Sequence, residues 1–310
     1  MYRATVIALI VIVATALGSS AFADGVSPWL PAPGAGFINL SYVSQNANEF
    51  YRTDRQAVPP RLGPGDQKGP TPGGGANLGQ HTVWLNGMYG WSDSIAIDVR
   101  VGLARSYFGG KTPAGELIPP TGGRDKYSGV TDSNIGVTWR IVDELVCPSL
   151  PSFALRGGAI IAGSYTPGWI SSIGDGASGF EVSALAGKYL ADWLAVSGEV
   201  GYRDREGDVP ADLFVNLSGG VLVDNIGLSV NYKLVDAQSG IQIGGPGFSP
   251  VTRVFPRLEE DIQFLSGTVT LNVTDTTNIG LTYGEVIDGR NTSKSKVFSA
   301  TMGYMFDTTL

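Results

Sequence analysis

The chain has 310 residues, of which 43% are hydrophobic and 44 are glycine, and its formal net charge is −7. This acidic balance, with Lys and Arg scattered along the chain, argues against nucleic-acid binding. The single cysteine, Cys147, excludes an intrachain disulfide framework, and the many aromatic residues argue against a disordered low-complexity chain.

The first residues are typical of a secretory signal peptide. Arg3 precedes an apolar run over residues 4–17, and small residues follow as far as Ala21-Phe22-Ala23. The run is shorter than the roughly 20 apolar residues that a membrane-spanning helix needs, and no later stretch approaches that length. We therefore predict a signal peptide over residues 1–23 and one domain over residues 24–310.

After a Pro-rich entry, the chain contains segments that alternate large apolar with small or polar residues. The clearest is 95–103, whose odd positions from Ile95 to Leu103 are large and apolar and whose even positions are small or charged. A period of two predicts a strand with one apolar and one polar face. In chain order, the twelve expected strands are 36–43, 81–91, 95–103, 134–141, 153–161, 180–190, 194–202, 213–221, 226–234, 264–273, 279–283 and 297–306.

The connections between these segments are unequal in length. Those after residues 91, 190, 221 and 273 are short, whereas those after residues 43, 103, 161 and 234 are long and rich in Gly and Pro. An even number of alternating strands, joined by short turns on one side and long loops on the other, is typical of a bacterial outer-membrane barrel. The predicted fold is all-β, an antiparallel transmembrane β-barrel with short periplasmic turns and long extracellular loops.

The cost of placing charge in lipid predicts which strand face points outward. Near the bilayer midplane an outward Arg or Lys costs roughly 2–4 kcal/mol, so the charged positions are expected to face the interior. Tyr89, Trp91, Trp193 and Tyr304, beside the short turns, would then form an interfacial aromatic belt. The candidate pore-lining residues are Asp98, Arg100, Arg140, Arg156, Glu199, Asn231 and Lys233.

Two arrangements of these interior charges remain open. They could pair across the barrel and plug it, or line opposite walls of a pore and orient a solute. Twelve strands lie between small, side-chain-filled barrels and wide porins, so we expect a narrow or partly plugged passage. Glycines at inward positions, such as Gly102, Gly136 and Gly220, are expected to widen it slightly.

Two short stretches resemble the outer-membrane barrel family associated with the meta-pathway of phenol degradation. They are Gly129-Val130-Thr131-Asp132 leading into Ile135-Gly136-Val137-Thr138-Trp139-Arg140, and the entry Trp29-Leu30-Pro31-Ala32-Pro33-Gly34. The resemblance loosely covers most of residues 24–310 and implies a porin-like protein that helps hydrophobic or aromatic compounds to cross the outer membrane. It implies no catalytic residue.

The last expected strand resembles the C-terminal assembly signal of outer-membrane barrels. Aromatic and apolar residues alternate along it and end at Phe306, although residues 307–310 continue beyond the usual end. The resemblance implies that the barrel assembly machinery is a partner of the chain.

Residues for catalysis or metal binding are sparse. His81 is the single histidine, so a multi-histidine metal site is excluded, and no local serine motif accompanies it. Carboxylates cluster at 259–261 and at Asp204, Glu206 and Asp208, but neither group has the spacing of a calcium loop. We expect a charged extracellular rim there, with no cofactor and no enzymatic activity.

The sequence thus favours an outer-membrane channel for passive uptake of small molecules, with the loop 46–80 as a gate at its mouth. Its expected partners are outer-membrane lipid and lipopolysaccharide, a small-molecule solute and the assembly machinery, without nucleic acid. Two alternatives remain open: a lipid-modifying enzyme that uses His81, and a closed barrel with a structural or adhesive role.

Overall fold

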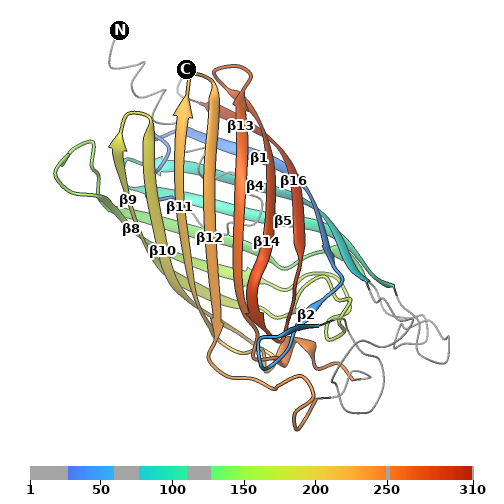
Figure 1. The fold of residues 1–310 in the computed structure, drawn as a ribbon. Coiled ribbons are helices and arrows are strands. Elements are labelled where there is room, and N and C mark those ends of the chain that lie inside the picture. The colour runs from blue at the N-terminus through green and yellow to red at the C-terminus, as the bar shows by residue number, and fades with distance from the viewer. Residues whose placement is uncertain (1–26, 59–76, 110–126, 249–251, 309–310) are drawn as a thin grey trace.

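The computed structural model describes residues 27–58, 77–109, 127–248 and 252–308, and these form a closed, tilted β-barrel (Figure 1). The predicted signal peptide and most of the predicted gate loop lie outside the described residues. Within the described ranges, no helix combines the length and the apolarity needed to cross a membrane.

Twelve antiparallel strands make up the barrel wall, which confirms the predicted fold and strand number. Each strand pairs with its neighbour along the chain, and β1 closes the barrel by pairing with the last strand, Ala35 opposite Asp307. The strands are β1 Ala35–Ala47, β4 Asn77–Ser92, β5 Ile95–Gly109, β7 Ser133–Val142, β8 Ser152–Ile161, β9 Gly179–Ala191, β10 Leu194–Arg205, β11 Asp212–Val223, β12 Ile226–Ala237, β13 Asp261–Asn272, β14 Thr277–Arg290 and β16 Lys296–Asp307.

The two ends of the barrel differ. Turns of two residues join β4 to β5, β9 to β10 and β11 to β12, and these lie at the end that we call the turn end. The longest connections lie at the opposite end, the loop end, which is the lower end in Figure 1, whereas residues 143–151 connect β7 to β8 at the turn end. The loop end also holds a small sheet of β2 Phe50–Tyr51, β3 Ala57–Val58 and β15 Thr292–Ser293. The strand β6 Ser128–Val130 and the short 3₁₀ helix η1 Phe255–Arg257 are the remaining elements.

Along the barrel strands, side chains alternate between inward, mostly polar positions and outward apolar positions, as the sequence predicts. On β1, Ile38 and Leu40 are 45% and 48% exposed, whereas the intervening Asn39 is 5% exposed. The large apolar side chains therefore cover the outside of the barrel, and the polar side chains point inward. This is the reverse of a soluble protein and fits a barrel surrounded by lipid.

Several strands are longer than predicted at the loop end. The expected strand 279–283 extends over Thr277–Arg290, and the strand expected to end at residue 103 continues to Gly109. Charged residues at outward positions, Arg105 on β5 and Glu285 on β14, interrupt the apolar alternation that marks a strand in the sequence, while the backbone ladder continues. The predicted strands therefore stop where the apolar alternation ends, although the backbone hydrogen bonds between the strands continue.

Candidate functional site

The interior of the barrel contains a compact ion cluster around Arg156 on β8. Its guanidinium donates to both carboxylate oxygens of Asp98 on β5, at 3.0 and 2.7 Å, and to a carboxylate oxygen of Glu181 on β9. Asn134 on β7 accepts a further hydrogen bond at 2.5 Å. Arg203 on β10 donates to the second oxygen of Glu181 at 3.2 Å, which extends the cluster over five neighbouring strands.

The inward glycines accommodate side chains of this interior. A Cβ atom on Gly136 would lie 2.4 Å from the Arg156 guanidinium, and one on Gly102 would lie 2.6 Å from the Trp84 ring. The expectation that these two glycines widen the passage was therefore wrong. Each of them makes room for a large neighbouring side chain that projects over it.

Arg100 and Lys233 also belong to the interior, on β5 and β12. The guanidinium carbon of Arg100 lies 4.0 Å from the centroid of the Trp84 ring, within cation–π distance. Arg203 on β10 is a third interior cation, and its guanidinium carbon lies 5.2 Å from the centroid of the Phe214 ring. Three strands of the wall thus carry an inward cation.

Two more predicted residues are buried in polar contacts nearer the β9–β12 wall. Glu199 accepts hydrogen bonds from Ser183 at 2.6 Å and from Asn216 at 2.8 Å. Asn231 accepts a hydrogen bond from Ser218. These residues face inward as the alternation predicts, but they do not contact the Arg156 cluster directly.

Arg140 lies apart from the other predicted residues. It donates to the carbonyl oxygen of Asp93 at 2.5 Å and pairs with Asp143 at 2.9 Å, both in connections at the turn end. The alternation predicts that Arg140 faces inward, but it does not predict the position of Arg140 along the barrel axis.

The segment before β1 enters the barrel at the turn end. Trp29 is 6% exposed, packs with Ala195 and Leu222, and donates through its indole N–H to Glu144 at 2.6 Å. Leu30 packs with Met88 and Ala96 in a second buried cluster. Because these partners come from β4, β5, β10 and β11, residues 28–33 reach across the interior at this end, and we call them the N-terminal strap.

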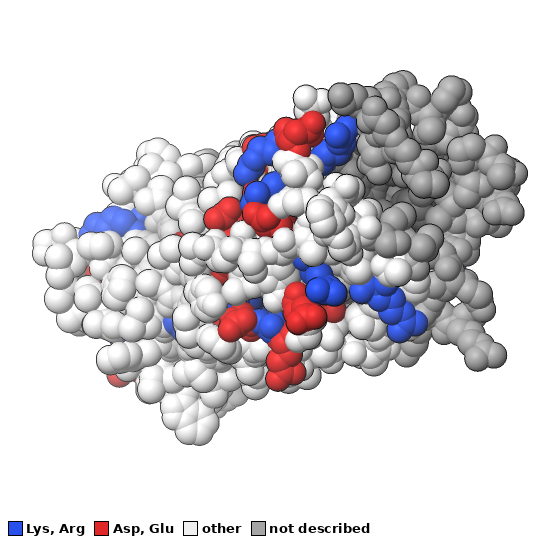
Figure 2. All heavy atoms as spheres, turned by 90° about the horizontal axis from the view of Figure 1, so that it is seen from below, with Lys and Arg blue, Asp and Glu red and all other residues white. Residues whose placement is uncertain are grey.

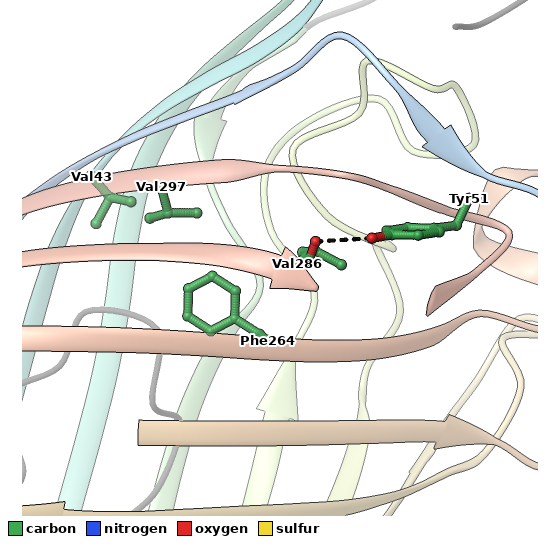
Figure 3. Close-up of a cluster of buried hydrophobic side chains, with 5 residues drawn as sticks. All are labelled: Val43, Tyr51, Phe264, Val286 and Val297. Atoms are coloured by element: carbon green, nitrogen blue, oxygen red, sulfur yellow. Dashed lines mark hydrogen bonds between the residues drawn. The ribbon is translucent and has the colours of Figure 1, made fainter. Parts of the chain in front are cut away.

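An apolar cluster lies inside the barrel near the loop end. Val43, Phe264, Val286 and Val297 project from four neighbouring strands, and Tyr51 of β2 covers them, donating to the carbonyl oxygen of Val286 at 3.4 Å (Figure 3). The small sheet containing β2 therefore packs directly on the barrel interior.

Ion pairs hold the loops together above this cluster. Asp261, 1% exposed, pairs with Arg55 at 2.9 Å and with Arg290 at 2.9 Å, and Arg290 also pairs with Glu259 at 2.7 Å. Viewed from the loop end, acidic and basic side chains gather in a central band beside a broad uncharged surface (Figure 2). The predicted charged rim thus includes part of the 259–261 cluster, as paired rather than isolated carboxylates.

The loop between β8 and β9 reaches inward at the same end. Ser106, an inward residue of β5, donates to the carbonyl oxygen of Ser171, and the amide of Phe255 donates to the carbonyl oxygen of Gly168 at 3.2 Å. Asp132 fixes the loop by accepting the Tyr165 hydroxyl at 2.7 Å, and burial together with this carboxylate raises the pKa of Tyr165 above its usual range. Two long connections therefore meet at the loop end.

His81 lies on the outward face, away from the interior. Its Nδ1 atom is 2.9 Å from the Tyr42 hydroxyl, and its ring stands between the rings of Tyr42 and Tyr107, each 6.0 Å away. Among the described residues, no serine hydroxyl makes a hydrogen bond with His81. The interaction is that of an aromatic cluster on the barrel exterior.

Sequence reasoning missed four residues that organise the interior: Glu181, Arg203, Trp29 and Trp84. Glu181 and Arg203 stand at inward positions near the loop-side ends of their strands. The alternation of inward and outward positions would therefore have been enough to predict that both face the interior. Trp84 lies opposite Gly102 in the β4–β5 register, a pairing that the hairpin predicts once its turn is fixed. Trp29 belongs to the entry stretch that resembles the barrel family, but it precedes the first strand, so alternation does not predict where its ring lies.

Comparisons with known proteins support the fold and leave the family unassigned. No family model matches the chain, and no curated protein matches it.

The COG4313 outer membrane channel from Pseudomonas putida F1 superposes with a TM-score of 0.64 at 13% identity, covering 90% of this chain and 97% of that one. The KdgM porin gives a TM-score of 0.46 at 8% identity, covering 87% and 99% of the two chains. The translocator domain of NalP from Neisseria meningitidis gives 0.44 at 11% identity, covering 89% and 90%. The similarity shows a barrel of the outer-membrane type, and membership of the phenol-degradation family remains a prediction.

Proposed function

We propose that the protein is a channel in the outer membrane of a Gram-negative bacterium, with the turn end in the periplasm, through which small and largely apolar molecules diffuse. The outward apolar belt and the similarity to a known outer-membrane channel support the location and the general role. The resemblance to a porin-like family linked with phenol degradation supports an apolar or aromatic solute.

An apolar solute is supported above all by the apolar side chains at both ends of the barrel interior. Trp29 and Leu30 of the strap occupy the turn end, and the cluster covered by Tyr51 occupies the loop end. Water-filled porins have wide polar lumens, whereas apolar side chains at a constriction favour apolar solutes and disfavour hydrated ions.

The entry of an apolar fluorescent probe into cells tests this proposal. A Gram-negative host that makes the protein should take up N-phenylnaphthylamine several-fold faster than the same host with an empty vector. Purified protein in a planar bilayer should pass little ionic current. Unchanged probe entry together with a large, steady conductance would instead mean a general hydrophilic pore.

Replacing the anchor of the strap tests how the turn end is closed. Trp29→Ala removes the buried ring and its hydrogen bond to Glu144, so we expect a several-fold rise in single-channel conductance. The matched control is Trp193→Ala, which removes an outward ring that is 55% exposed at the same end. Equal conductance in Trp29→Ala and wild-type protein would contradict closure by the strap.

A further inference from the structure

Two basic side chains stand on the outside of the barrel near the loop end. Arg105 on β5 is exposed at an outward position, and the side chain of Lys296 on β16 is 69% exposed. Arg105 lies ten residues from Ile95, at the turn end of β5, and Lys296 lies eleven residues from Asp307, at the turn end of β16. At about 3.3 Å per residue and a tilt of about 40°, both reach roughly 25 Å, the height of the apolar belt of an outer-membrane barrel. The two cations therefore lie at the level where lipid chains end and headgroups begin.

An aromatic cluster lies at the same level between the two cations. His81 on β4 is opposite Arg105 in the strand register, and its Nδ1 atom lies 2.9 Å from the Tyr42 hydroxyl. The Tyr107 ring crosses from β5 onto β4, where a Cβ atom on Gly79 would overlap it. Tyrosine is typical of the boundary between lipid chains and water. Ring faces thus cover the outside of β4, which lies between the strands that carry the cations.

The outward charge differs between the two sides of the barrel. The basic positions belong to the consecutive series β5, β4, β1 and β16, whereas Asp204 and Asp236 occupy the corresponding outward positions of β10 and β12. Lys296 has a distant partner in Glu285, at 3.8 Å. Within the part of the chain that the structure describes, no carboxylate pairs with Arg105. The β5–β16 side therefore presents positive charge to the surrounding headgroups.

From this geometry we infer that the outer face of β5, β4, β1 and β16 binds the glucosamine disaccharide of lipopolysaccharide, which carries a phosphate group at each end. The inference rests on the proposed location of the chain, with the loop end at the outer leaflet. Arg105 and Lys296 are three strands apart, which is about 14 Å across the sheet. This separation suits two phosphates at opposite ends of one disaccharide better than a single phosphate. Each phosphate accepts charge-assisted hydrogen bonds from one cation, and the sugar rings pack on the Tyr107 and His81 rings between them.

Native mass spectrometry of purified, folded protein in detergent tests the site, because it counts the lipid molecules bound to each protein. Diphosphoryl lipid A should bind about fivefold more tightly than monophosphoryl lipid A, as expected for one further contact between a phosphate and a basic residue at a membrane surface. Arg105→Gln and Lys296→Gln should each weaken binding of the diphosphoryl form by about the same factor and lower the preference for the second phosphate. Arg105→Lys, which keeps the charge, should retain most of the binding and controls for effects on folding.

Arg257→Gln is the matched control, because it removes a loop-end cation that is 48% exposed but lies in η1, off the barrel wall. It should leave lipid A binding unchanged. Equal binding of the two lipid A forms to the wild type, or undiminished binding in both Arg105→Gln and Lys296→Gln, would overturn the site. Phosphatidylglycerol binding as tightly as diphosphoryl lipid A would also overturn it, in favour of a general surface for anionic phospholipids. None of these results bears on uptake of the neutral probe, so failure of this inference is distinguishable from failure of the channel proposal.

Discussion

Arg156 is the residue on which the charged side of the interior depends. It pairs with Asp98 and Glu181, and its side chain is 4% exposed. Breaking a buried ion pair by removing one partner costs more than the pair contributes, because the remaining charges are left without compensation.

We therefore predict that Arg156→Gln lowers the free energy of unfolding by about 2 kcal/mol, since two carboxylates would lose their main cation in a partly hydrated interior. Urea unfolding in liposomes, followed by tryptophan fluorescence, measures the change. Arg140→Gln, whose partner Asp143 is 18% exposed, should cost less than about 1 kcal/mol. Equal losses in the two variants would show that the Arg156 cluster has no special structural role.

At the scale of elements, the loop end is assembled from connections that are distant in the sequence. Asn291, 3% exposed, donates to Gln242 and to the carbonyl oxygen of Glu259, and accepts from the amide of Ile243 and from Thr53. One side chain thus joins three connections. Its backbone φ of +54° is one that asparagine tolerates better than most residues.

The connection before β13 should respond to pH through Glu260. Burial raises the pKa of this carboxyl to about 7, although a hydrogen bond from Thr292 opposes the shift. The folded state therefore holds this proton more tightly than the unfolded state does. The resulting stabilisation is complete below about pH 4.5 and is lost as the pH rises through about 7.

Glu260→Gln should remove this loss, because glutamine is neutral throughout. We expect the variant to gain on the order of 2 kcal/mol relative to wild type at pH 8, with little difference at pH 4. Amide hydrogen exchange of β15 and of the start of β13, recorded for both proteins at both pH values, measures this gain in stability. A gain of the same size at both pH values would contradict a titrating Glu260.

For the whole molecule, stability depends on keeping charge off the outward surface. Val137, near the middle of β7, is 49% exposed on that surface. Val137→Arg should destabilise the barrel by roughly 2–4 kcal/mol in a lipid bilayer, measured by urea unfolding in liposomes. Leu150→Arg is the matched control, with equal exposure but a place in the β7–β8 connection, and should change stability little. Equal effects of the two variants would contradict a lipid-covered β7.

The sequence by itself determined the strand number, the order of turns and loops, and the face of each strand that points outward. These follow from local patterns: an alternation of period two, Gly- and Pro-rich breaks, and the cost of charge in lipid. It therefore placed Asp98, Arg100 and Lys233 inside the barrel without any knowledge of their partners.

Only the tertiary structure decided which interior side chains meet. Closing the barrel sets how far each strand is shifted along its neighbour, so Arg156 meets Asp98 and Glu181 while Arg140 stays at the turn end. The place of Trp29 was likewise decided by closure, because its partners Ala195 and Leu222 lie more than 160 residues further along the chain. Alternation fixes the direction of a side chain, but contact across an interior depends on register and curvature, which belong to the assembled sheet and to no single segment.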